Sequence, residues 1–407
     1  MRPSLSERKL VVLIGSVQLL LTLDFTLVLP LGPDFAKALG IPTSELGLVG
    51  ASYNAAEAVV AIAGAFFLDR FDRRRLLAVA LTGLVIGTAA SGLATGLVSL
   101  VTTRAFAGVF GGIAETLVYT IVIDAVAPER RGRAIGAIAS TTAVASVLGV
   151  PAGLELARLG GWRVPFFTLA AFGIVFVAAA ISLLPPQRAH LAAQQTPLRA
   201  VLSRSVVRLG LTCMAIGTIA HYTLVPNISA YVQFNRGYPR DRLGLIYMIG
   251  GGFVFGTIRI AGWLTDRYAA PSLALFGTML YATVLIFGFI YPVDAIPMVV
   301  IFVGFMISSS FRFVPMRALM SRVPGPGERA RFLSVESAVD CAAAATGAML
   351  GPQILSERPD HSLAGIGELA LLAVAMTFVY SALCYAVARR VRAHVVGSAR
   401  PTFGASD

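Results

Sequence analysis

The chain has 407 residues, of which 57% are hydrophobic and 13% are charged. Soluble domains carry about 25% charged residues, so this composition excludes a soluble globular protein and indicates that lipid is the main solvent. The net charge of +12 and the isoelectric point near 10.2 would fit a nucleic-acid-binding protein, but the placement of the basic residues argues against that class.

Apolar stretches of 20 or more residues recur along the whole chain. Each can cross about 30 Å of hydrocarbon as a helix that rises 1.5 Å per residue. The first follows a basic start and continues past Asp24 to Pro30 without a small-residue cleavage site, so we expect a first helix rather than a removed signal peptide. The predicted spans lie at about 10–30, 45–68, 75–95, 97–123, 134–154, 163–185, 206–230, 243–265, 272–292, 296–316, 332–355 and 364–388.

The lysines and arginines are distributed unevenly between the two sides of these spans. With the N-terminus inside, 23 of the 33 lie in cytoplasmic segments, 7 in external segments and 3 within helices. Cytoplasmic loops of membrane proteins carry such an excess. We therefore expect a multi-pass protein of the bacterial inner membrane with both termini in the cytoplasm. Its basic charge reflects topology and contact with the lipid bilayer, not nucleic acid.

One long polar interruption, residues 186–205, divides the spans six and six. The loop Leu68-Asp69-Arg70-Phe71 after the second span recurs as Thr265-Asp266-Arg267-Tyr268 after the eighth, which indicates an internal repeat. We predict an N-terminal half over 1–185, a linker over 186–205, a C-terminal half over 206–391 and a disordered tail over 392–407. The three cysteines, Cys213, Cys341 and Cys384, fall in apolar stretches, so we expect small core residues.

Two cytoplasmic turns, AFFLDRFDRRRLL (65–77) and GWLTDRY (262–268), resemble the loop signature of the major facilitator superfamily. The second copy fits well, whereas the first has Ala65 and Asp72 where the family usually has glycine. Arg104 with Gly108, PERRGRA (128–134), and LGVPAG (148–153) followed by GWRVPF (161–166) are similar to the twelve-helix drug:proton antiporter group, also called the arabinose-efflux type. LDFTLVLPLGP (23–33) and FRFVPMRALM (311–320) are also similar to members of that group.

This resemblance implies an all-α major facilitator fold, with 12 transmembrane helices in two six-helix halves. It further implies a rocking, alternating-access carrier that exports small organic molecules against protons. We expect a monomer that needs no cofactor and no metal.

The repeated turns are interpreted as a cytoplasmic latch. Asp69 lies beside four arginines and can form charge-assisted contacts that stabilise one state of the carrier. The alternative is a solvated anchoring turn. The predicted latch residues are Asp69, Arg70, Arg73, Gly262, Asp266 and Arg267.

Pro151 lies between Gly149 and Gly153 in the fifth span. Proline removes a backbone hydrogen bond and glycine permits close packing, so we predict a kink here. The kink either sets the direction of transport or only serves packing.

Ionisable groups within hydrocarbon cost a few kcal/mol each, and they normally face the bundle interior and mark ion or substrate paths. Asp24 lies near mid-depth in the first span and is predicted to bind substrate or protons, with a cap on a helix break near Pro30 as the alternative. Glu57 and Glu115 are predicted to do the same, although either could pair with Arg104 or a backbone group. Tyr119, one turn after Glu115, can hydrogen-bond its carboxyl.

Glu336 and Asp340 are spaced i and i+4, so they share one face of the eleventh helix. Two carboxylates this close repel, and a proton or an organic cation would relieve the repulsion. The alternative is a static ion pair with Arg312, which lies at a similar predicted depth.

Arg104 is predicted to control the proton affinity of a carboxylate, with snorkelling to the interface as the alternative. His221 titrates in a range suited to proton coupling, but a lone histidine in a helix is more often a structural group.

We weigh two transport functions: proton-coupled export of small amphipathic or cationic molecules, and a dedicated metabolite symporter or facilitative carrier of the same fold. The sequence has no GxSxG, HExxH or P-loop motif and no Cys/His metal spacing. We therefore do not expect an enzyme. The expected partners are a small-molecule substrate, protons and the bilayer.

Overall fold

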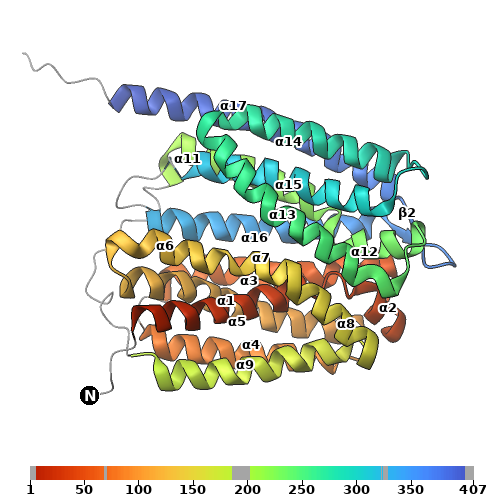
Figure 1. Cartoon of the computed structure of the whole chain (residues 1–407), viewed down its shortest axis with the longest axis horizontal. Coiled ribbons are helices and arrows are strands. Elements are labelled where there is room, and N and C mark those ends of the chain that lie inside the picture. Colours follow the sequence, from red (N-terminus) through yellow and green to blue (C-terminus); the bar gives the residue numbers. More distant parts are fainter. Residues whose placement is uncertain (1–5, 68–70, 186–201, 322, 324–328, 399–407) are drawn as a thin grey trace, which may run out of the picture.

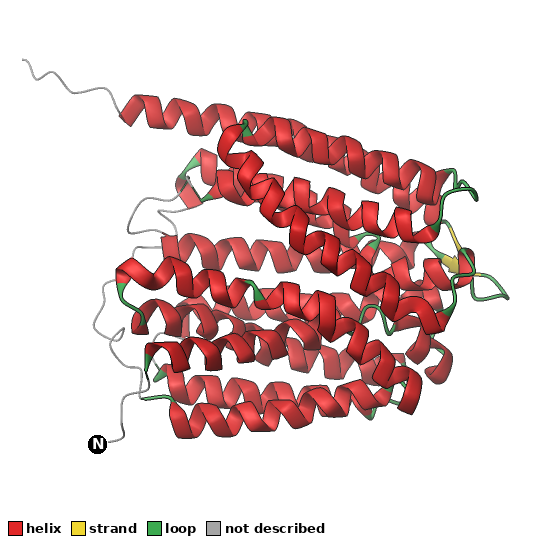
Figure 2. Cartoon of the chain, viewed as in Figure 1, coloured by secondary structure: helices red, strands yellow, loops and turns green. Residues whose placement is uncertain are grey.

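The computed structural model of the chain describes residues 6–67, 71–185, 202–321, 323 and 329–398. Almost all of them are helical (Figure 2). A helix satisfies its backbone hydrogen bonds within its own segment, which is what an apolar environment requires. Asp69, Arg70 and most of the predicted linker lie outside the described residues.

The N-terminal half is built from long helices joined by short turns. The helical segment of the fifth predicted span contains one π-helical turn, η3. The elements are α1 (Glu7–Thr26), α2 (Gly32–Leu39), η1 (Thr43–Glu45), α3 (Leu46–Phe67), α4 (Arg73–Gly92), α5 (Leu97–Ala125), α6 (Pro128–Ala139), α7 (Thr141–Val144), η3 (Ala145–Gly149), α8 (Val150–Gly160) and α9 (Arg163–Leu183).

The C-terminal half repeats this plan and adds a two-stranded antiparallel hairpin, β1–β2. The elements are α11 (Ser205–Tyr222), η5 (Val225–Asn227), α12 (Ile228–Ala230), η6 (Tyr231–Asn235), η7 (Arg240–Arg242), α13 (Leu243–Arg267), α14 (Ala270–Leu285), η8 (Ile286–Ile290), α15 (Met298–Met320), α16 (Arg329–Ile354), β1 (Ser356–Glu357), β2 (Leu363–Ala364) and α17 (Ile366–Ser398).

Among the described residues, 11 helical segments are long and apolar enough to cross a membrane. The remaining predicted span corresponds to α16, which has 26 residues but also carries Glu336 and Asp340. The prediction for the tail needs a correction, because α17 continues through Ser398 instead of ending near Arg392. The added residues, 392–398, begin with an arginine and an alanine, which favour helix, and no proline interrupts them.

The helices run roughly parallel, with the start of α1 and the end of α17 at the same end of the bundle (Figure 1). We call this the terminal end, and the end that carries β1 and β2 the opposite end. In the view of Figure 1, α4, α5 and α9 lie on one side, α14, α15 and α17 on the other, and α16 and α3 between them.

The hydrophobic cores differ between the two ends. At the opposite end a single core joins residues of both halves, such as Leu27 and Leu154 with Leu243 and Leu355. Towards the terminal end each half has its own core, one containing Ile121 and the other containing Met316, Leu319 and Val387, among others. The halves are therefore packed together at the opposite end.

Close backbone contacts and polar contacts between the halves lie at the same end. A Cβ on Gly47 of α3 would lie 2.2 Å from the carbonyl oxygen of Ala348 in α16, so glycine is required for this approach. Arg240 forms a two-pronged ion pair with Asp34, and the backbone N–H of Thr43 donates to Glu357 at 2.5 Å. We call these two polar contacts the inter-half clasp.

Candidate transport site

Asp24 and Arg104 form an ion pair in the interior of the N-terminal half. Both side chains are 1% exposed, and Arg104 Nη1 lies 3.1 Å from Asp24 Oδ2. Thr88 of α4 donates to Asp24 Oδ1 at 2.6 Å, and Arg104 Nη2 donates to the Asp24 carbonyl at 3.0 Å. The guanidinium also lies 4.6 Å from the centre of the Tyr53 ring on α3. Four helices are thus tied together by one buried charge pair.

This pair changes two of the interpretations above. Arg104 is fully buried and does not snorkel, and its carboxylate partner is Asp24 rather than Glu57 or Glu115. The Asp24 carboxylate does not cap the helix break that follows α1, because its oxygens are bound by Arg104 and Thr88. Arg104 Nε has no hydrogen-bond partner within the described protein.

Glu57 and Glu115 form a second centre, between the two halves. Glu57 lies on α3 and Glu115 on α5, close enough for their charges to interact. Gln18 of α1 donates to Glu115 Oε1 at 3.5 Å. Cys341, on α16 of the other half, also lies close to Glu57. Among the described residues, Glu115 is hydrogen-bonded to Gln18 and not to Tyr119.

Asp340 lies one turn from Glu336 on α16 and next to Cys341. Its Oδ1 accepts from Thr218 of α11 at 2.5 Å, and its Oδ2 lies 3.5 Å from Arg317 Nη2. We refer to Glu57, Glu115 and Asp340 as the central acidic cluster. The ring of Tyr222 closes this region and lies 6.4 Å from the ring of Phe25 in the other half.

Arg312 is not the partner of Asp340, so the alternative of a static ion pair between them is wrong. Its side chain is 0% exposed and lies over the Tyr281 ring, with 4.3 Å from Cζ to the ring centre. Nη2 donates to the Gly217 carbonyl at 3.3 Å, whereas Nε and Nη1 have no hydrogen-bond partner within the described protein. Arg312 is therefore a cation packed against aromatic rings, not a member of a charge pair.

His221 belongs to the aromatic packing of the C-terminal half. Its Nδ1 lies 3.3 Å from Ser309 Oγ, and its ring stacks on Phe305 with a centroid distance of 5.2 Å. Phe313 meets the ring edge-on. This environment matches the structural alternative for His221, outside the central acidic cluster.

The glycines of the fifth span pack directly on α1. A Cβ on Gly149 would lie 2.2 Å from Leu23 Cδ2, and one on Gly153 would lie 2.5 Å from both terminal methyl groups of Leu27. Pro151 lies at the first turn of α8, directly after the π-helical turn η3. The irregular turn and the small residues bring this span against α1, close to Asp24.

The predicted latch residues that the structure describes have different partners. Arg73 is bound by Asp124 of α5 and donates to the Thr120 carbonyl at 3.2 Å. Arg267 lies over the Trp263 ring, 3.9 Å from its centre, and Asp266 is exposed. A Cβ on Gly262 would have no neighbour within 4 Å.

Sequence reasoning missed several neutral residues of the site, because polar groups without charge and a cysteine give no charge signal. These are Gln18, Tyr53, Thr88, Thr218 and Cys341. Arg317 was missed for another reason, since it lies just beyond the predicted end of the tenth span at 316. Cys341 was predicted as a core residue and lies close to Glu57 of the other half. Among the described residues, no group of three or more His, Cys, Asp and Glu side chains is placed to hold a metal ion.

The sequence profile of the Major Facilitator Superfamily matches residues 14–348. The chain belongs to this superfamily. Its fold is similar to that of a bacterial homologue of the human lysosomal transporter Spinster in an inward-facing, unoccupied conformation, with a TM-score of 0.77, 14% identity, and 97% and 98% of the two chains covered. A D-xylose–proton symporter gives 0.77 at 16% identity, over 92% and 96%. The nucleoside transporter NupG gives 0.68 at 12% identity, over 94% and 99%. The predicted superfamily and fold are confirmed.

Proposed function

We propose that this superfamily member is a proton-coupled secondary transporter that exports small amphipathic or cationic organic molecules by alternating access. We further propose that it lies in the bacterial inner membrane with its terminal end in the cytoplasm, and that it belongs to the drug:proton antiporter group. The observation that carries this proposal is the pair of neighbouring carboxyl groups, Glu57 and Glu115, between the two halves, with Asp340 nearby.

Two ionised carboxylates in the same buried place repel each other, whereas a protonated carboxyl can donate a hydrogen bond to an ionised one. The pair can therefore take up a proton, and an organic cation that enters beside it can replace that proton. This exchange is the elementary step of a proton-coupled exporter of cations.

The state of the bundle supports alternating access. The halves share a core at the opposite end and have separate cores towards the terminal end. With the terminal end in the cytoplasm, this packing is what a cytoplasm-facing state requires, and an exporter takes up its substrate in that state.

A second candidate is a dedicated carrier of a polar metabolite, by symport or facilitated diffusion. It is favoured by buried amide groups without hydrogen-bond partners in the described protein, namely Gln18 Oε1, Asn54 Nδ2, and both Asn227 side-chain atoms. Unpaired buried amides cost free energy unless a ligand or water satisfies them. A hydroxyl-rich substrate would do so.

The test is flux in proteoliposomes with and without a pH gradient, using a lipophilic organic cation and a neutral sugar as alternative substrates. For the exporter, cation flux depends on the gradient, and Glu115→Gln abolishes that dependence. Glu155→Gln is the control, since Glu155 lies on the exposed surface beside Arg158. Sugar flux that is indifferent to the gradient would favour the second candidate and contradict proton coupling.

A further inference from the structure

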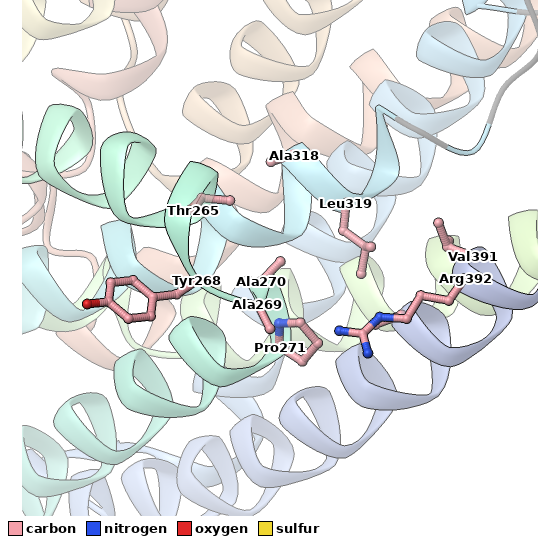
Figure 3. A pocket seen from close by; sticks show the side chains of 10 residues that line it. Thr265, Tyr268, Ala269, Ala270, Pro271, Ala318, Leu319, Val391 and Arg392 are labelled. Atoms are coloured by element: carbon pink, nitrogen blue, oxygen red, sulfur yellow. The ribbon is translucent and has the colours of Figure 1, made fainter. Parts of the chain in front are cut away.

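A cavity of about 120 Å³ lies at the terminal end of the C-terminal half (Figure 3). It is separate from the central acidic cluster and lies where the end of α13, the start of α14 and the last turns of α15 and α17 meet. The loop between α13 and α14, which forms one wall, is the second copy of the repeated Asp-Arg turn. The lining residues are Thr265, Tyr268, Ala269, Ala270, Pro271, Ala318, Leu319, Ala388, Val391 and Arg392.

Two sources of positive potential meet in this cavity. The guanidinium of Arg392 points between Leu319 and Pro271 (Figure 3), and no ion pair or hydrogen bond engages it within the described residues. Helix α14 starts at the cavity wall without a side-chain cap, because its N-cap residue is Ala269. An uncapped helix start carries partial positive charge and favours an anion. Asp266, although close in sequence, does not line the cavity.

The surroundings of the cavity are those of a membrane interface. Tyr268, which lines it, is 64% exposed, and Trp263 on the same helix is 52% exposed. Tyrosine and tryptophan gather at the level of the lipid headgroups. Arg267 over Trp263, and the exposed Arg389 and Arg390 on α17, place further cations at this level.

We propose that this cavity binds the phosphate headgroup of an anionic phospholipid, with Arg392 as the charge partner and the start of α14 as a second anion-binding element. A basic pocket between transmembrane helices on the cytoplasmic side suits such a headgroup. The bound lipid bridges α17 to the α13–α14 loop, and so ties the repeated turn to the end of the last helix. The inference does not depend on which substrate the protein carries.

The experiment uses the full-length protein in phosphatidylcholine nanodiscs that contain a minor fraction of phosphatidylglycerol. Retained phosphatidylglycerol is counted by native mass spectrometry of the released protein. Arg392→Gln is expected to lower retention at least fivefold, because it removes the charged hydrogen-bond donor that lines the cavity. Arg389→Gln is the matched control, an arginine on the same helix that does not line the cavity, and is expected to change retention much less than Arg392→Gln.

A second variant tests whether lipid retention needs the space in the cavity as well as the charge of Arg392. Ala318→Leu keeps Arg392 and a helix-forming residue but fills the space, so it is expected to reduce retention as strongly as Arg392→Gln. Equal loss in Arg392→Gln and Arg389→Gln would mean diffuse surface attraction and would overturn the proposal. Full displacement of the lipid by millimolar inorganic phosphate would identify a free-phosphate site and overturn the lipid assignment.

Discussion

Asp34 and Arg240 join the two halves through a two-pronged ion pair at the opposite end of the bundle. Arg240 Nε lies 2.7 Å from Asp34 Oδ1, and Nη2 contacts the second carboxylate oxygen. The carboxylate is on α2 of one half and the guanidinium on η7 of the other. A change of state that separates the halves at this end must break both bonds.

We therefore expect Asp34→Asn to shift the carrier away from the observed state. The two side chains are 23% and 26% exposed, so solvent screens the pair and its contribution is about 0.2–1 kcal/mol. That corresponds to a population change of up to about fivefold. Distances between spin labels at Lys37 and Arg358, which are exposed at this end on different halves, would report the shift. Glu155→Gln, which breaks a pair within one helix, should leave the distances unchanged; an equal effect of both variants would contradict the role of the clasp.

The second part of the clasp should respond to acid. Burial raises the pKa of Glu357, but hydrogen bonds with His361 and with the Thr43 backbone outweigh burial and hold the pKa below the ordinary 4.5. A group whose pKa is lowered in one state stabilises that state above the ordinary value and stops doing so as the pH falls through the lowered value. The spin-label distance should therefore be constant above pH 4.5 and lengthen below it.

Glu357→Gln is the matched variant for this pH response. It should lengthen the distance modestly at every pH and remove the acid transition. A transition that persists in Glu357→Gln would assign it to another group.

The ion pair of Asp24 and Arg104 should be essential to folding as well as to transport. Asp24→Asn leaves a buried guanidinium without its counter-charge, and breaking a buried pair on one side costs roughly 3–5 kcal/mol in soluble cores. Thr88→Val removes only one hydrogen bond to Asp24, which leaves the pair in place and should cost about 1 kcal/mol. Thermal unfolding in detergent would rank the two variants. Equal stability of Asp24→Asn and wild type would contradict the structural role of the pair.

The spans could be predicted from the sequence because a helix that crosses hydrocarbon needs a minimum length and carries few charged residues. The two halves could be predicted because the polar segment 186–205 divides the spans and the Asp-Arg turn is repeated. The sequence also allowed Asp24 and Arg104 to be selected one by one. Their pairing was missed because a single sequence does not show which helices are neighbours in space. The first and fourth spans run in opposite directions, which is how a late residue of one and an early residue of the other reach the same level.

The sequence could not exclude an ion pair between Arg312 and Asp340, for a different reason. Depth along the bundle was a sound guide, since Arg312 contacts Gly217 and Asp340 contacts Thr218, which are neighbours on α11. Successive residues of an α-helix point about 100° apart at 3.6 residues per turn. The two side chains therefore meet different faces of α11. Rotation about the helix axis, unlike depth, depends on tertiary packing and could not be obtained from hydropathy.

Because Arg312 and Asp340 contact different faces of α11, we expect them to have different roles, which the sequence could not distinguish. Because Arg312 contacts aromatic rings and a backbone carbonyl instead of a carboxylate, its replacement leaves no carboxylate unpaired. Arg312→Met keeps the length of the side chain and removes a buried charge. We expect a folded protein, with unchanged or higher stability by up to about 4 kcal/mol, as for other buried charges replaced by apolar residues of similar volume.

Asp340→Asn is expected to act in the opposite way. Thr218 can still donate to the asparagine oxygen. Among the described residues the only ion pair lost is with Arg317, whose side chain is 65% exposed, so stability should change little. The cluster loses a carboxylate, however, and we expect pH-dependent transport to be lost. Thermal unfolding and proteoliposome flux measured on both variants distinguish the two residues. If Asp340→Asn unfolds while Arg312→Met stops transport without loss of stability, then the roles assigned here are reversed: Arg312 serves transport, and Asp340 is structural.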